Sequence, residues 1–200
     1  LPQIVHLLIL FLTFFKKLPG IGEKTAERLA FSVMNMDNDT VILFSNSLKN
    51  VKNKIKRCTI CGNITENNIC DICKNEARDN NIICVVEDAK NVISLEKMGS
   101  YNGKYHVLNG LISPMDGKGP DDISIDSLIS RVKKDDIKEV IIAISPTLEG
   151  ETTSLYITKL LENTKVVVSK IAYGIPMGAD MEYLDPMTLS MALLNRNKVS

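Results

Sequence analysis

The sequence contains no tryptophan, only two histidines and no excess of charge of either sign. Lys and Arg together number 24, as do Asp and Glu, so the net charge does not indicate a polyanionic partner. The charges are nevertheless unevenly distributed. Residues 1–80 carry 11 basic and 8 acidic side chains, whereas residues 81–200 carry 13 and 16. A surface that contacts a polyanion is therefore expected in the first half of the chain.

A long apolar run is also missing. The stretch LLILFLTFF at residues 7–15 is shorter than the roughly 20 residues that cross a bilayer. A signal peptide would have a basic start before this run and a small-residue cleavage site after it, but KKLPGIG follows instead. We interpret the run as a buried or partner-facing helix, and we expect a cytoplasmic protein without a membrane segment.

The first 57 residues are predicted to be helical. In EKTAERLAFSVM the apolar residues recur at helical spacing and fall on one face; they are Ala26, Leu29, Ala30, Val33 and Met34. A further helix is expected from about Thr40 to Lys56, with Asp37 or Asp39 as its cap.

From residue 82 onward, short apolar runs alternate with helical patterns, which predicts a parallel sheet with helices on its faces. The expected strands are 82–87, 105–108, 139–144 and 165–169, and the expected helices are 88–98, 125–132, 153–161 and 185–195. His106 falls in the second strand and is interpreted as a core or edge residue rather than a base. The segment GLISPMDGKGPDD (110–122) lacks the spacing of a P-loop and is interpreted as a structured surface loop.

Four cysteines have the spacing C-x2-C-x8-C-x2-C. They are Cys58, Cys61, Cys70 and Cys73. Each pair brings two thiolates to one ion through a tight turn, and two such turns complete a tetrahedron. Two disulfides are the alternative, but nothing in the sequence indicates an oxidising compartment. Because four sulfurs leave no open position for a substrate, we predict one structural Zn²⁺. The fifth cysteine, Cys84, is interpreted as a buried inert thiol.

The segment KKLPGIGEKTAERLAF has the form of a helix-hairpin-helix. Gly20 and Gly22 allow a tight turn whose backbone N–H groups stay open to a phosphate, and the second helix adds its positive N-terminal end. Lys24 and Arg28 are four residues apart, so they share a helix face next to that turn. A plain helical hairpin with solvated basic side chains is the alternative. The combination of LPGIG with Lys-x3-Arg favours contacts with the DNA backbone, irrespective of sequence.

Acidic residues follow two of the expected strands. Glu87 ends IICVVE, while Glu149 and Glu151 lie in the loop AISPTLEGETT (143–153). The ends of parallel strands can lie side by side, so the three carboxylates are expected to converge. This arrangement resembles a Toprim domain, the module of topoisomerases and DnaG-type primases, in which such carboxylates bind Mg²⁺ for phosphoryl transfer. Ser145 and Thr147, however, stand where catalytic Toprim domains have Asp-x-Asp.

The order of the motifs along the chain resembles one family, the RecR recombination mediators of bacteria. The motifs are LPGIGEKTAERLAF, the cysteine cluster, ICVVE, YHVLNGLISPMDGKGP, SPTLEGETTSLYI and GIPMGADMEYLDPMTLSMAL. The resemblance implies an α+β chain of several parts. These are a helix-hairpin-helix region at 1–57, a four-cysteine zinc finger at 58–73, an α/β Toprim domain with a parallel sheet at 80–170, and a C-terminal helical oligomerisation segment at 171–200.

The resemblance also implies a function without catalysis. It is that of a DNA-binding mediator of recombinational repair, which forms dimers or tetramers around DNA and acts with RecO and RecF to load recombinase on gapped single-stranded DNA. Glu87, Glu149 and Glu151 are then expected to bind a basic partner such as RecO. The alternative is an enzyme, a Mg²⁺-dependent Toprim nuclease or primase-like phosphotransferase that uses the same three carboxylates.

Overall fold

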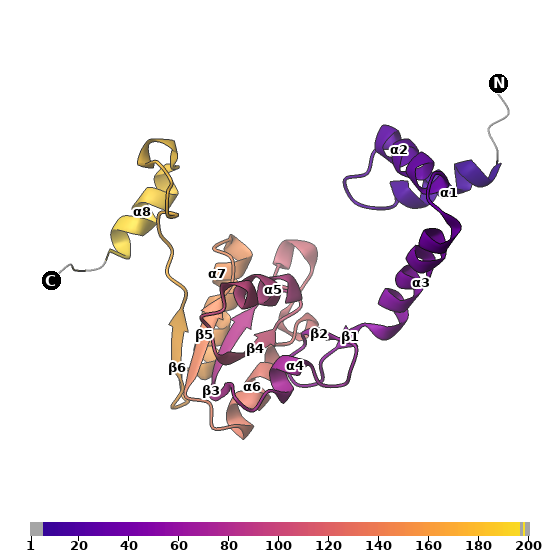
Figure 1. The fold of residues 1–200 in the computed structure, drawn as a ribbon. Helices are drawn as coiled ribbons and strands as arrows, with labels where there is room; N and C mark the ends of the chain where they lie inside the picture. The colour runs from indigo at the N-terminus through magenta and orange to yellow at the C-terminus, as the bar shows by residue number, and fades with distance from the viewer. Residues whose placement is uncertain (1–5, 197, 199–200) are drawn as a thin grey trace. The chain divides into compact units, whose positions relative to one another are not determined.

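A computed structural model describes residues 6–196 and residue 198 of the chain, shown as a ribbon in Figure 1. The chain divides into two compact units, Leu1–Ile55 and Lys56–Ser200. Among the helices formed by the described residues, none has both the length and the apolar character needed to cross a membrane.

The first unit contains three helices, α1 (His6–Lys16), α2 (Glu23–Met34) and α3 (Asn38–Lys54). Asp37 is the N-cap of α3 and accepts a hydrogen bond from the Thr40 N–H at 2.8 Å, so the first of the two expected caps is the one used. The helix ends two residues earlier than expected, because Lys56 and Arg57 form a short strand. The helical prediction for this region is confirmed.

The first unit buries few side chains. On the apolar face of α2, Ala26 and Ala30 are buried, but Met34 is 61% exposed. The run at residues 7–15 does form a helix, α1, which contacts α2. No side chain of α1 is buried within this chain, so the interpretation of the run as a buried helix is wrong, and the partner-facing alternative stays a prediction.

The second unit begins with the cysteine-rich segment. Strands β1 (Lys56–Arg57) and β2 (Ile64–Thr65) pair antiparallel, and the short helix α4 (Asp71–Lys74) follows. These elements are too short to form a core of their own. Their interior consists of Cys58, Cys61 and Cys70, with Ile69, Ile72 and Cys73 packed against them.

The centre of the second unit is a four-stranded sheet in the order β4-β3-β5-β6, in which all neighbouring strands are parallel. Its strands are β3 (Asp79–Val86), β4 (Gly103–Val107), β5 (Glu139–Ala143) and β6 (Val167–Lys170). The predicted parallel sheet is confirmed. Its central strands are apolar on both faces because helices cover both sides.

Helices cover the two faces of the sheet unequally. Alternate residues of β3 point to opposite sides, so Ile83 and Val85 pack with α6 (Ile125–Lys134) and α7 (Leu148–Leu161), while Cys84 and Val86 pack with α5 (Ala89–Met98). The larger core therefore lies between the sheet and the pair α6 and α7.

The start of α7 differs from the sequence prediction. A helix was expected from residue 153, but α7 begins at Leu148, so the segment Glu149-Gly150-Glu151 forms its first turn instead of a loop. The side chain of Thr147 caps the helix by accepting a hydrogen bond from the Gly150 N–H at 3.1 Å. Gly150 is required here, since a Cβ at this position would lie 2.0 Å from the carbonyl oxygen of Ser145.

The expected surface loop joins β4 to α6 and contains two short 3-10 helices, Pro114–Asp116 and Pro120–Asp122. After β6 the chain continues through Met181–Tyr183, also a 3-10 helix, to α8 (Pro186–Leu194), which confirms the last predicted helix. No side chain of α8 is buried.

Candidate functional site

The four cysteines of the C-x2-C pairs meet in one cluster. Their sulfur atoms all lie within 4.8 Å of one another. The sulfurs of Cys61 and Cys70 are 3.6 Å apart. Sulfurs at about 2.3 Å from a central zinc ion would be about 3.8 Å from each other in a regular tetrahedron. All four cysteines are free thiols, so the disulfide alternative is not adopted. The donor set therefore fits one tetrahedral zinc ion.

The backbone around the cluster has the geometry of two metal-binding turns. The Cys58 N–H donates to the Asn63 carbonyl at 2.7 Å, and the Gly62 N–H donates to the Cys58 carbonyl at 2.9 Å, with Gly62 at a φ of +73°. The Cys70 N–H points at the sulfur of Cys58, 3.3 Å away. Hydrogen bonding with Cys70 raises the pKa of the Cys61 thiol.

Cys84 lies outside this cluster. It is buried in β3, where burial raises the pKa of its thiol to about 12. Such a thiol stays protonated at neutral pH and is a poor nucleophile.

The glycine hairpin connects α1 to α2. Gly20 adopts a φ of +78°, which side chains rarely adopt, whereas Gly22 is extended and is the N-cap of α2. No side chain caps this helix start, and a Cβ added at either glycine would meet nothing within 4 Å. The turn and the first N–H groups of α2 are thus open to a ligand.

Lys24 and Arg28 are both exposed on α2, one helical turn apart. Glu23 precedes them and forms an ion pair with Lys16 at 3.4 Å, so that its charge is partly offset. The basic run that follows in the sequence, KNVKNKIKR, adds five exposed side chains, those of Lys49, Lys52, Lys54, Lys56 and Arg57. The last two bond within the cysteine-rich segment, Lys56 to the Asn68 side chain and Arg57 to the Gly62 carbonyl.

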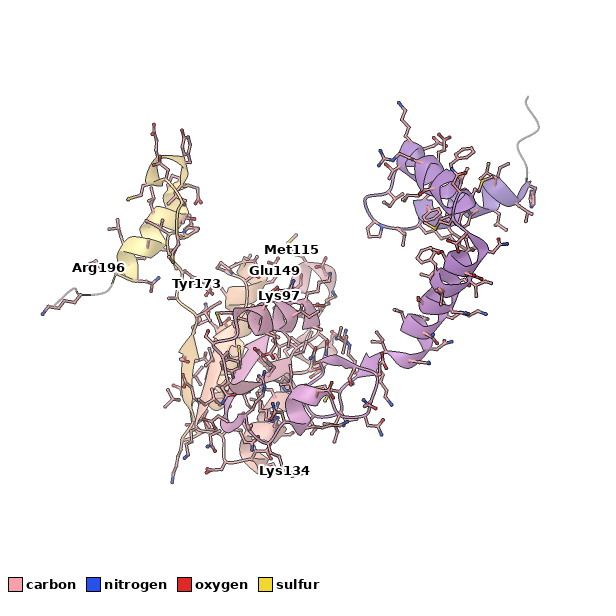
Figure 2. All side chains as sticks on the ribbon, viewed as in Figure 1. Lys97, Met115, Lys134, Glu149, Tyr173 and Arg196 are labelled. Atoms are coloured by element: carbon pink, nitrogen blue, oxygen red, sulfur yellow. The ribbon has the colours of Figure 1, made fainter. Side chains whose placement is uncertain are left out.

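Two of the three singled-out carboxylates share a cleft at the end of the parallel strands. Glu87 follows β3 and Glu149 lies in the first turn of α7, and both line a cavity of about 440 Å³. The rest of the lining is Gly110, Leu111, Ser113, Asp116, Lys118, Ser145 and Thr147. Figure 2 shows Glu149 at the end of the α/β unit opposite to Lys134. We call this cavity the acidic cleft.

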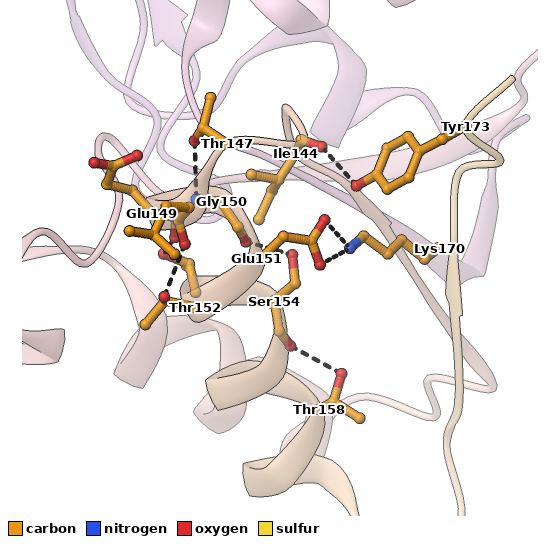
Figure 3. Close-up of polar contacts among 12 residues, drawn as sticks. Ile144, Thr147, Glu149, Gly150, Glu151, Thr152, Ser154, Thr158, Lys170 and Tyr173 are labelled. Carbon is orange, nitrogen blue, oxygen red and sulfur yellow. Dashed lines mark hydrogen bonds and ion pairs between the residues drawn. The ribbon is translucent and has the colours of Figure 1, made fainter. Parts of the chain in front are cut away.

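Glu151 does not line the acidic cleft. It binds the ammonium of Lys170 with its two carboxylate oxygens at 2.7 and 2.6 Å, as Figure 3 shows. The cause is the early start of α7, because residues two apart on a helix point to different sides. Glu151 instead borders a separate cavity with Tyr173 and Met187. The structure thus brings Glu87 and Glu149 together and directs Glu151 away.

The acidic cleft contains two charged residues that the sequence patterns did not identify, Asp116 and Lys118. Asp116 accepts a hydrogen bond from the Ser113 hydroxyl at 2.8 Å, and the backbones of Ser113 and Lys118 are bridged. Both residues belong to the motif GLISPMDGKGPDD (110–122), which was interpreted from the sequence as a surface loop. Only the fold brings this loop, which lies about 30 residues before Ser145, to the same cleft.

His106 is a core residue, as one of the two interpretations had it. It is 1% exposed, and its Nε2 lies 2.9 Å from the Ser124 carbonyl. Burial lowers the pKa of this imidazole to about 4, which keeps it neutral at physiological pH.

The geometry thus defines a class of chain in which a glycine hairpin, a four-cysteine cluster suited to a metal ion and a Toprim-like parallel sheet follow one another in sequence. Family models match the chain in this same order. They are the helix-hairpin-helix of RecR at residues 12–52, the four-cysteine zinc finger domain of RecR at 55–75, the Toprim domain at 81–172, and the C-terminal region of RecR at 174–197.

Three similar relatives carry the same name. Recombination protein RecR from Staphylococcus aureus strains JH9, Newman and USA300 is in each case 51% identical over 185 residues, which is 92% of this chain and 93% of the relative. The chain belongs to the RecR family of recombination proteins, and the resemblance and fold class expected from the sequence are confirmed. Its four clustered cysteines form a zinc-finger centre suited to one zinc ion.

Proposed function

We propose that this protein is a recombination mediator that binds DNA through its glycine hairpin, without regard to sequence, and helps to load recombinase on gapped single-stranded DNA together with RecO and RecF. The observation that carries the proposal is the open hairpin. Gly20 and Gly22 leave the start of α2 accessible, and Lys24 and Arg28 stand exposed beside it in a chain of the RecR family.

The chemistry of the hairpin suits phosphate rather than bases. Backbone N–H groups at a helix start and two flexible cations bind the sugar-phosphate backbone, which single- and double-stranded DNA share. One hairpin offers few such contacts, so binding by one chain is expected to be weak. Several hairpins in a homo-oligomer, a dimer or a tetramer ring, would then act together on one DNA molecule.

The test is the double change Lys24→Ala, Arg28→Ala, compared with Lys133→Ala, Lys134→Ala, which removes the same charge from exposed positions on α6. The hairpin variant is expected to bind all DNA sequences more weakly. The slope of the logarithm of the binding constant against the logarithm of the salt concentration should become shallower by about 2 for each engaged hairpin. Each phosphate contact that is lost contributes about 0.9 to this slope. An unchanged slope, or an equal loss in the control, would place the DNA site elsewhere.

Within this proposal the acidic cleft binds a basic segment of the partner protein. Glu87, Glu149 and Asp116 supply its negative charge, which Lys118 in the same lining offsets in part. Glu151, the third carboxylate expected to bind the partner, lies outside the cleft, where Lys170 largely offsets its charge. Salt screens the attraction between oppositely charged surfaces. The association rate of this protein with its partner should therefore fall as the salt concentration rises. The same charges repel DNA. A cytoplasmic location belongs to the same proposal.

Glu149→Ala is expected to weaken the complex with RecO and to leave folding, zinc content and DNA affinity unchanged. Glu162→Ala is the matched control, since this residue is exposed just after the end of α7. If both variants bind the partner as well as the unchanged protein does, the cleft is not the partner site.

The second candidate is an enzyme, which the Toprim match and the shared position of Glu87 and Glu149 favour. Two-metal phosphoryl transfer requires several carboxylates to hold the ions. Ser145 and Thr147 in the same lining supply only hydroxyl groups. Cleavage of DNA or synthesis of primers that depends on Mg²⁺ or Mn²⁺, and that Glu149→Ala abolishes, would establish the enzyme and exclude the first proposal for this cleft.

A further inference from the structure

Both halves of the cysteine cluster are bonded to one strand, β4. The first half is attached through its backbone, because the Val107 N–H donates to the Cys61 carbonyl at 2.8 Å. Gly62 packs directly on this point, since a Cβ there would lie 2.8 Å from the Val107 carbonyl oxygen. The strand lies at one edge of the sheet, and the Cys61 carbonyl is the partner of the Val107 N–H on its free side.

The second half is attached through a side chain, that of Lys104. Its ammonium donates to three backbone carbonyls at the end of the second turn: those of Ile72 at 2.8 Å, Cys73 at 3.2 Å and Asn75 at 2.6 Å. Three bonds use all the donors that an ammonium has. The residue is only 3% exposed, although a lysine in GKYHV would be expected at the surface.

The buried charge of Lys104 needs an opposite charge, which the carbonyls do not supply. They satisfy the hydrogen bonds, but a buried cation that is not compensated by an anion is costly. Lys104 forms no ion pair with any carboxylate among residues 6–196. Asp135 and Asp136 line the same polar cavity as Lys104, and Asp135 lies 3.7 Å from Arg131 instead.

The cysteine cluster has the complementary charge. A zinc ion held by four thiolates carries an excess of two negative charges. Cys58, Cys61 and Cys70 are buried, so water reaches this charge poorly. The Lys104 ammonium is bonded to the backbone of Cys73 itself, which places a cation beside the negative centre.

We propose that Lys104 is a positioning residue of the zinc centre: its ammonium offsets the charge of the zinc-thiolate cluster and holds the Cys70–Cys73 turn against β4, so that zinc binding and the order of this sheet edge stabilise each other. The zinc site itself is the one described above. The coupling to the Toprim sheet through this lysine is the new element.

The experiment compares Lys104→Met, Lys104→Arg and Lys74→Met. Methionine keeps the length and apolar stem of Lys104 without its charge, arginine keeps the charge, and Lys74 is an exposed lysine on α4 next to Cys73. Zinc release from the full chain is followed with a chromogenic chelator, and zinc affinity by competition. Lys104→Met is expected to weaken zinc binding about 10-fold or more. Losses of this size are typical when a residue that hydrogen-bonds to a metal ligand is replaced. Lys74→Met should stay within about twofold, and Lys104→Arg should recover most of the loss.

Thermal unfolding with and without zinc separates this role from simple packing. Under the proposal, Lys104→Met lowers the unfolding temperature of the zinc-loaded protein more than that of the chelator-treated protein. An equal decrease in both states would overturn it, because the lysine would then stabilise the sheet independently of the metal. Zinc release from Lys104→Met at the rate of the unchanged protein, or equally fast release from the methionine and arginine variants, would overturn it as well.

Discussion

The two units of the chain are stabilised in different ways. Among the described residues of Leu1–Ile55, only Ala26 and Ala30 are fully buried. In Lys56–Ser200 a continuous core joins the sheet to α6 and α7, and a second cluster lies under α5. Both units are rich in apolar residues, so composition does not explain the difference. The larger unit has a sheet whose two faces can be covered, whereas the smaller has helices with little to pack against.

The difference indicates which part of the molecule depends on other molecules. The first unit leaves large apolar side chains exposed on α1 and α3, among them Leu7, Phe14, Leu43 and Leu48. A groove of about 500 Å³ along α1 is lined almost entirely by such residues. Apolar surface of this extent is typical of an interface. The larger unit is therefore expected to hold its fold alone, and the smaller to gain stability on assembly.

Zinc removal should have the largest effect on the larger unit. Cys58→Ser removes one of four ligands, and the cysteine-rich segment has no other core than the cluster. Loss of zinc content and loss of order in residues 58–73 are expected together, with a marked fall in the unfolding temperature. Metal analysis and calorimetry measure both. A protein that stays fully folded without metal would contradict the structural role of the ion.

A cavity in the main core should come next. Leu128→Ala removes a fully buried side chain of α6 and should lower the free energy of unfolding by about 2–5 kcal/mol. Leu155→Ala on α7 makes the same chemical change at a side chain that is 69% exposed, and should cost well under about 1 kcal/mol. Urea unfolding of both variants gives the comparison. Equal losses would show that the core is not where the structure has it.

His106 should make the larger unit sensitive to acid. Burial lowers its pKa from 6.5 to about 4, so the unfolded chain takes up a proton first as the pH falls. The free energy of unfolding should thus decrease below pH 6.5, by about 2 kcal/mol between pH 7 and pH 5, and level off below pH 4. His106→Gln should remove this part of the pH dependence, and His6→Gln at an exposed position should not. Identical pH profiles for all three proteins would contradict the prediction.

The Glu151–Lys170 ion pair should matter little for stability. Their side chains are 42% and 30% exposed, and such pairs contribute no more than about 1 kcal/mol. Lys170→Met should therefore cost a few tenths of a kcal/mol to about 1 kcal/mol, and less at high salt. Unfolding measured at low and high salt tests this. A salt-independent loss would mean that Lys170 acts through packing, for which its position over the Tyr173 ring at 4.9 Å is the candidate.

Deletion of residues 1–15 should leave the stability of the larger unit unchanged. Of the changes considered, this one is expected to affect the larger unit least. What should change is assembly, because the deletion removes most of α1 and its exposed apolar side chains. Light scattering is expected to show a lower oligomer order. An intact assembly would exclude α1 as an interface, and a destabilised larger unit would contradict the division into two units.

Much of the fold followed from local patterns. The C-x2-C pairs predicted the cluster of four sulfurs, because the chemistry of a tetrahedral ion dictates that spacing. The alternation of apolar strands and amphipathic helices predicted the parallel sheet, since both periods are local. The start of α7 was placed too late from the sequence because the cap of this helix, Thr147, lies in a segment that was interpreted as a loop. Because α7 begins five residues earlier than expected, Glu149 and Glu151 lie on a helix and point to different sides, Glu149 into the acidic cleft and Glu151 to Lys170.

The sequence by itself determined which residue types are available and in what order: four thiols at metal spacing, two glycines before a basic helix, and carboxylates after two strands. These are properties of short segments, whose conformation depends on neighbours a few residues away. Only the tertiary structure decided which carboxylates share a cleft and that Lys104 lies buried against the cysteine-rich segment. Both outcomes depend on the packing of elements about 30 residues or more apart in the chain, such as Lys104 on Ile72 and Glu149 beside Asp116. Burial and charge are set by such distant contacts, which no local pattern records.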